Sequence, residues 1–89
     1  MRQIKTHAFR GSRYKVKHSN LLRGAGDLGR SNYEKKAIYI PHDGDTKDEL
    51  DTIIHEALHL AYPFLTEDEV ERGANELTGL LWRLDWRKE

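Results

Sequence analysis

The stretch TKDELDTIIHEALHLAYPFLTEDEV, residues 46–70, decides how this 89-residue chain folds. Thr46 is followed three residues later by a glutamate, and so is Thr66. This spacing is the capping box, in which side chains satisfy the free backbone groups at the start of a helix. Pro63 disfavours helical backbone geometry at Tyr62, so the first helix is expected to end there. The stretch therefore predicts two helices joined by a tight turn.

Apolar residues recur at helical spacing in both segments, which predicts that each helix packs one face on a core. In the first helix these residues are Leu50, Ile53, Ile54, Ala57, Leu58 and Ala61. In the second helix, expected to run to about Leu84, they are Val70, Ala74, Leu77, Leu81 and Leu84.

The chain before the helices is typical of strands and turns. Tyr14, Val16 and His18 alternate with cationic residues, a period-two pattern that predicts a half-buried strand. Further strands are expected within 3–10, 28–33 and 36–40, with glycine-rich turns at 22–29, and Pro41 ends the last strand. The prediction is an α+β fold: a small, mostly antiparallel sheet followed by two packed antiparallel helices.

Length and composition place the chain in a narrow class. Eighty-nine residues are enough for one small domain, 1–89, with a basic β-rich half at 1–41 and a two-helix half at 46–84. The absence of cysteine excludes disulfides and thiolate metal sites. The first residues lead into no apolar run, and no segment has the ~20 apolar residues of a membrane span. We therefore expect a soluble, cytoplasmic protein.

The overall charge of zero hides a strong asymmetry along the chain. Residues 1–36 hold ten Lys/Arg against two acids, a net charge of +8, whereas residues 37–89 hold five against thirteen, a net charge of −8. Such a division can mark a surface that binds nucleic acid, with contacts from Arg10, Arg13, Lys15 and Lys17. The alternative is that basic strands simply pack beside acidic helices.

The first predicted helix contains His55-Glu56-Ala57-Leu58-His59, an H-E-x-x-H motif. Histidines four residues apart lie one turn apart on the same helix face, so both imidazoles can reach one metal ion. Glu56 then projects beside that metal, where it can deprotonate a bound water. The motif predicts Zn²⁺ bound by His55 and His59, with Glu56 as the catalytic base.

A catalytic zinc needs a third protein ligand and an open fourth position. Tyr62 and Leu65 occupy the positions where the metzincin extension requires glycine and histidine, which excludes that branch. On an antiparallel second helix, the rise per residue brings Glu71 back to the height of the histidines. Glu67 and Glu76 remain alternatives.

Asn75 lies four residues beyond Glu71 on the same helix face. It is a candidate to accept the free N–H of a metal-bound imidazole, or else a surface residue between the helices.

The motif together with Glu71-Arg72-Gly73-Ala74-Asn75 resembles the gluzincin branch of zinc metallopeptidases. It is most similar to compact phage and bacterial zincin-like proteins of the ImmA/IrrE kind, and SprT-like proteases combine such a site with DNA binding. The resemblance covers about residues 36–84. It implies zinc on His55, His59 and Glu71, with Glu56 as base, and hydrolysis of a protein or peptide substrate.

Other parts of a peptidase site are less well defined by the sequence. The candidates for stabilising the oxyanion are Tyr33, Tyr39, His42 and Tyr62. If the strand at 36–40 is a sheet edge, an extended substrate can pair with it. The rival functions are a non-catalytic zinc-binding regulatory module and a DNA-associated protein that uses the basic half.

Overall fold

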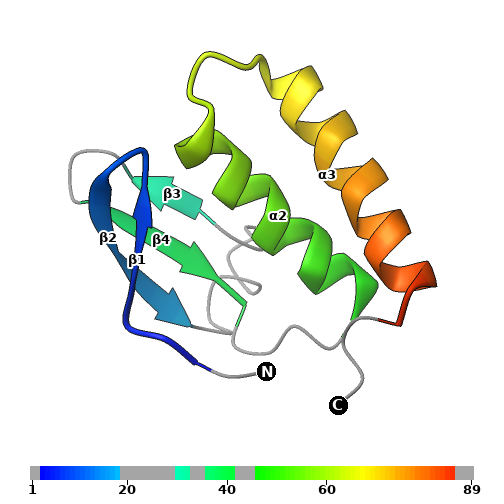
Figure 1. Ribbon diagram of the computed structural model, residues 1–89, viewed down its shortest axis with the longest axis horizontal. Helices are drawn as coiled ribbons and strands as arrows, with labels where there is room; N and C mark the ends of the chain where they lie inside the picture. The colour runs from blue at the N-terminus through cyan, green and yellow to red at the C-terminus, as the bar shows by residue number, and fades with distance from the viewer. Residues whose placement is uncertain (1–2, 19–29, 33–35, 42–45, 86–89) are drawn as a thin grey trace.

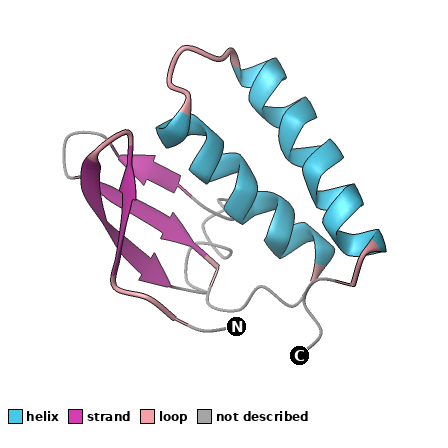
Figure 2. Cartoon of the chain, in the orientation of Figure 1, coloured by secondary structure: helices cyan, strands magenta, loops and turns pink. Residues whose placement is uncertain are grey.

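The computed structural model describes residues 3–18, 30–32, 36–41 and 46–85. The strands come first: β1 (Thr6–Phe9), β2 (Ser12–His18), β3 (Arg30–Asn32) and β4 (Ala37–Ile40). The helices α2 (Lys47–Ala61) and α3 (Glu67–Arg83) follow, as Figure 2 shows. Strands and helices are thus segregated along the chain, and the predicted α+β class is confirmed. The predicted turns at 22–29 lie outside the described residues.

The four strands form one mixed sheet in the order β1-β2-β4-β3. β1 pairs with β2, and β3 with β4, in the antiparallel sense, but β2 and β4 run parallel. Two of the three pairings are thus antiparallel, as the predicted mostly antiparallel sheet requires, and the parallel pairing of β2 with β4 at the centre makes the sheet mixed. The physical reason is that β4 inserts between β2 and β3 and does not add to an edge.

The burial of β4 explains why it takes a central position. Ala37, Ile38 and Ile40 are buried, whereas the three residues of β3 are Arg-Ser-Asn. An apolar strand contributes most to stability in the interior of a sheet, where neighbouring strands bury its side chains, and a polar strand is suited to an edge. Because β4 is internal, it cannot pair with a substrate strand, and that sequence-based hypothesis is wrong.

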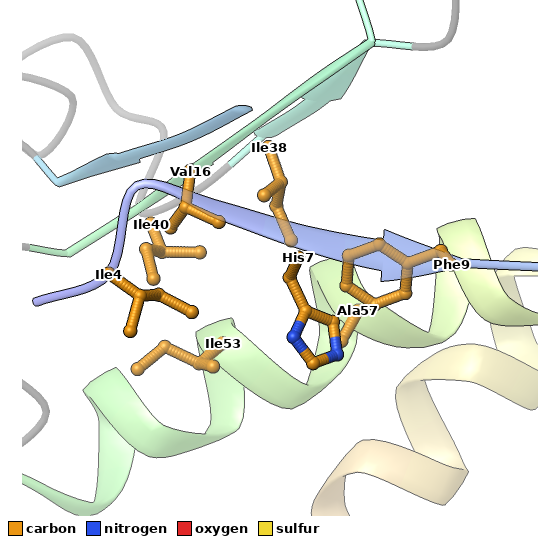
Figure 3. Close-up of a pocket in the computed structure, with 8 residues that line it drawn as sticks. All are labelled: Ile4, His7, Phe9, Val16, Ile38, Ile40, Ile53 and Ala57. Atoms are coloured by element: carbon orange, nitrogen blue, oxygen red, sulfur yellow. The ribbon is translucent and has the colours of Figure 1, made fainter. Parts of the chain in front are cut away.

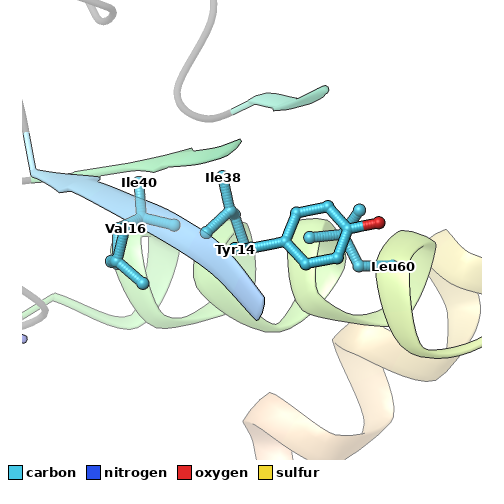
Figure 4. Packing of buried hydrophobic residues seen from close by; sticks show 5 residues of the cluster. All are labelled: Tyr14, Val16, Ile38, Ile40 and Leu60. Atoms are coloured by element: carbon cyan, nitrogen blue, oxygen red, sulfur yellow. The ribbon is translucent and has the colours of Figure 1, made fainter. Parts of the chain in front are cut away.

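The hydrophobic core lies between the sheet and α2. Its centre consists of Tyr14 and Val16 from β2, Ile38 and Ile40 from β4, and Leu60 from α2 (Figure 4). Leu60 is only 2% exposed, although it was not among the apolar positions expected to face the core. One face of α2 thus packs against the sheet through this core.

α2 lies between the sheet and α3 (Figure 1). Every residue from 51 to 59 is half-buried, as expected for a helix with neighbours on two sides. One of these contacts is at Gly73 of α3, which lies against the side chain of Leu58. The histidines of the motif are therefore held on a helix supported by both layers.

α3 packs on α2 through a narrower stripe than the sequence predicts. Val70, Ala74 and Thr78 are buried, whereas Leu77 is 44% and Leu84 is 65% exposed. The predicted stripe is thus correct at its beginning and wrong at these two leucines. Small side chains at 74 and 78 let the helices approach closely, which turns the bulkier leucines outward.

Both predicted capping boxes are present. The Thr46 hydroxyl accepts a hydrogen bond from the Glu49 backbone N–H at 3.1 Å, and the Thr46 N–H donates to the Glu49 carboxylate at 3.2 Å. At the start of α3 the equivalent distances are 3.1 and 2.8 Å, between Thr66 and Glu69. These boxes fix where each helix begins, and hence where Glu67 stands.

Replacing Thr66 with alanine is expected to lower the free energy of unfolding by about 1 kcal/mol, the usual cost of losing such a cap. Thr66→Ser keeps the hydroxyl and serves as the matched control, with most of the stability retained. Urea denaturation of the metal-free proteins measures both. Equal losses in the two variants would show that the hydroxyl does not cap α3.

In the described part of the chain, no helix has the length and apolar character needed to cross a membrane.

Candidate metal centre

Three side chains from two helices converge at the end of α2 next to the turn. Nε2 of His55 and Nε2 of His59 lie 3.2 Å apart. The Glu67 carboxylate bridges them, with Oε1 2.8 Å from the His55 nitrogen and Oε2 3.3 Å from that of His59. Among the residues that the structure describes, these are the three whose ligand atoms lie close enough together to hold a metal ion.

The spacing of these atoms matches a tetrahedral zinc site. Two bonds of 2.0–2.1 Å at a tetrahedral angle place their ligand atoms roughly 3.3 Å apart. The observed separations of 3.2 and 3.3 Å agree with this value, and the third, 2.8 Å, is somewhat shorter. Two imidazole nitrogens and one carboxylate oxygen are also donors that zinc prefers. The residues present therefore fit a zinc ion.

The cluster is open to solvent. Each histidine side chain is 24% exposed and Glu67 is 64% exposed. The imidazoles are thus held by their helix but still reachable from one side. A centre of this kind can admit a metal ion and then a second molecule.

The structure brings Glu67 to the histidines in place of Glu71. Glu67 is the first residue of α3 and already lies beside His59, whereas Glu71 is one turn further on, about 6 Å along the helix. The expectation for Glu71 assumed that α3 begins level with the end of α2. The connection at 62–66 instead carries the chain back before α3 starts. Of the two alternatives to Glu71, Glu67 is the residue in the cluster and Glu76 is not.

Asn75 is exposed on α3 and eight residues beyond Glu67, which is about 12 Å along the helix. That distance removes Asn75 from the level of the imidazoles.

Sequence reasoning overlooked Asp51, which lies four residues before His55 and interacts with it electrostatically. Burial raises the pKa of the Asp51 carboxyl, and the His55 charge opposes this rise. The i, i+4 spacing was the signal that could have revealed it.

Glu56 follows His55 directly in α2 and is half-buried. Successive residues in a helix are turned by about 100°, so its side chain leaves the axis beside the histidine pair and not in line with it. Glu56 is not a member of the three-residue cluster. This position is compatible with a group that acts on a molecule at the metal without itself holding the metal.

The candidates for an oxyanion donor are distributed over different parts of the fold. Ile38 and Ile40 face the core, so Tyr39 between them emerges on the opposite face of the sheet, away from α2. Tyr62 is the C-cap of α2, three residues after His59, and is 50% exposed. It makes an edge contact with Phe64, with ring centroids 6.0 Å apart. Tyr33 and His42 lie outside the described residues.

A separate apolar cavity of about 220 Å³ lies between β1 and α2 (Figure 3). Ile4, His7 and Phe9 line it on one side, and Ile53 and Ala57 on the helix side. These two helix residues are two positions either side of His55, about 200° around the axis. The cavity is therefore separated from the metal centre by the width of α2.

Comparison of the chain with protein-family models, with curated proteins and with solved structures found no match. The class of site, two histidines one turn apart with a glutamate from the next helix, therefore rests on the residues and their geometry.

Proposed function

We propose that the chain is a zinc-dependent metallopeptidase of the gluzincin type, in which Glu67 takes the place of the third ligand implied by the resemblance to ImmA/IrrE-like proteins. The observation that carries the proposal is the convergence of His55, His59 and Glu67 at ligand-to-ligand distances suited to zinc. Supporting it, Glu56 stands next to the first histidine, where hydrolytic zinc sites need a base.

The number of ligands favours catalysis over a structural role. Structural zinc sites usually use four protein ligands, whereas catalytic sites use three and keep one position open. The cluster in the described residues has three members. When bound, zinc lowers the pKa of water towards ~7 and polarises a carbonyl group.

The chain's own residues then supply the proton transfers of peptide hydrolysis. The Glu56 carboxylate takes a proton from the attacking water as the new C–O bond forms. It gives that proton to the amine as the C–N bond breaks, so the products are an acid and an amine. Tyr62, the exposed C-cap three residues after His59, is the candidate donor for the developing oxyanion that lies nearest along the chain to the histidines.

Among the described residues, the edge strand β3 offers an extended substrate a place to bind beside this helix. β3 is an edge of the sheet in the described part of the chain, and it contacts α2. A peptide that adds to this edge makes main-chain hydrogen bonds and runs alongside the helix that holds the histidines. Substrate pairing therefore moves from β4 to β3.

Metal removal tests the proposal directly. We expect nearly one zinc per chain by elemental analysis, and hydrolysis of unfolded casein that stops after chelation and returns with added zinc. Magnesium and calcium prefer oxygen ligands, so they serve as controls that do not restore activity. A zinc-loaded protein that hydrolyses neither casein nor a peptide library would instead be a non-catalytic zinc-binding module.

A further inference from the structure

The sheet has one face that no described element covers. Both helices lie on the same side of it (Figure 1). On β2, Tyr14 and Val16 point into the core on that side, whereas Arg13, Lys15 and Lys17 are exposed on the other. With a rise of ~3.3 Å per residue, these three cations form a row about 13 Å long. We call this surface the outer sheet face.

The neighbours of this row are mostly small. In the register of the sheet, Ala8 of β1 lies opposite Arg13, and Ala37 of β4 lies opposite Lys15. Lys17 is paired with Tyr39, which is half-buried on the same face. The long cationic side chains of the row thus extend further from the sheet than the alanines beside them, and the aromatic ring of Tyr39 lies at one end of the row.

The described part of the outer sheet face also lacks negative charge. The described strands and their turns, 3–18, 30–32 and 36–41, contain seven Lys/Arg and no Asp or Glu. The described helical part, 46–85, contains three Lys/Arg and ten acids. Charges of one sign on one face create a local positive field in a chain whose formal net charge is zero.

The Arg13 side chain is positioned within this face. Its Nη1 donates a hydrogen bond to Oγ1 of Thr6 on the neighbouring strand at 3.1 Å. A guanidinium carries five N–H donors, so this bond leaves others available for an anion. Arg13 is therefore oriented by β1 and still able to contact a ligand.

We propose that the outer sheet face binds single-stranded nucleic acid. A row of evenly spaced cations matches a chain of phosphates, and an aromatic side chain on a sheet gives an unpaired base a surface on which to stack. An anionic membrane fits less well, because the described residues of this face include no large exposed apolar side chain to insert. An acidic peptide also fits less well, because its carboxylates have no aromatic base to stack on Tyr39. This proposal is independent of the peptidase activity.

The test is fluorescence anisotropy with a labelled 20-nucleotide single strand, using the full chain. The variant Arg13→Gln/Lys15→Gln/Lys17→Gln is compared with Lys47→Gln/Arg72→Gln/Arg83→Gln, which removes three exposed cations from the helices. At 0.1 M salt the sheet variant is expected to bind roughly 100-fold more weakly, and its salt slope to fall by about 2, because each phosphate contact contributes ~0.7. The helix variant is expected to keep wild-type affinity.

A second variant tests the aromatic part of the proposal without changing charge. Tyr39→Leu is expected to weaken binding roughly 5- to 150-fold, the usual effect of losing one stacked base, with an unchanged salt slope. Circular dichroism and zinc content confirm that each variant is folded.

Four results would overturn the proposal. They are no binding by wild type at low salt, equal losses in the sheet and helix variants, equal affinity for duplex, and binding to phosphatidylserine vesicles without binding to the oligonucleotide. Retained binding in Glu56→Gln, with hydrolysis lost, separates this surface from the peptidase site.

Discussion

Glu56→Gln is expected to reduce kcat/KM for peptide hydrolysis by roughly 10²–10⁴-fold, the usual contribution of a general base. Glutamine has nearly the same size as glutamate, but it cannot accept the proton of the attacking water. Since Glu56 is outside the metal-binding cluster, zinc affinity should stay at the wild-type value. A quenched-fluorescence peptide assay at saturating zinc measures the first quantity, and a competition titration with a chelating dye measures the second.

Glu76→Gln is the matched control for this experiment. Glu76 is exposed on α3, nine residues after Glu67 and so about 13 Å further along the helix. Glu76→Gln makes the same chemical change away from the site, and it is expected to leave kcat/KM and zinc affinity unchanged. If Glu56→Gln keeps wild-type turnover, another group acts as the base. If Glu56→Gln loses its zinc, the glutamate has a structural role at the centre.

The second large effect concerns metal affinity. Glu67→Ala removes one of three ligands, and we expect zinc to bind roughly 10²–10³-fold more weakly. The estimate follows from ~10–16 kcal/mol for a structural zinc with four ligands, or about 2.5–4 kcal/mol for each. Competition titration at pH 7 measures this loss, and turnover at limiting zinc should fall in parallel.

Glu71→Ala is the decisive comparison, because it removes an exposed glutamate from the same helix only one turn away. We expect it to bind zinc as tightly as wild type. Tight binding by Glu67→Ala together with weak binding by Glu71→Ala would return the third ligand to the position that the family resemblance implies. His59→Ala is a positive control that should lose zinc in either case.

Features set by local chemistry could be predicted from the sequence. The two capping boxes need only Thr46 with Glu49 and Thr66 with Glu69, and both form as expected. Pro63 follows directly on Tyr62, the C-cap of α2. The convergence of the two histidines likewise depends only on helix periodicity.

Features set by how segments pair could not be predicted in the same way. Alternation in β2 indicates a strand but does not say which strand lies beside it, so the parallel pairing with β4 was missed. The apolar character of Ala37–Ile40 beside the polar Arg30–Asn32 was the available signal for an internal strand and an edge strand. Local sequence patterns therefore predict which strands are buried more readily than they predict which strands pair with each other.

The third ligand depends on the path of five connecting residues. Counting the rise per residue assumes that two helices start and end at the same level, and a shift of one turn exchanges Glu67 for Glu71. The backbone hydrogen bond from the Leu65 N–H to the Tyr62 carbonyl, 3.1 Å long, belongs to the tight turn that sets this level. Such a turn is not encoded in the helical periodicity on either side.

A crystal structure of the zinc-soaked protein, with anomalous scattering measured at the zinc edge, tests the central claim most directly. We predict one strong anomalous peak within bonding distance, ~2.0–2.2 Å, of Nε2 of His55, Nε2 of His59 and a carboxylate oxygen of Glu67. A peak bound by Glu71, or no peak between the two histidines, would contradict the proposed metal centre.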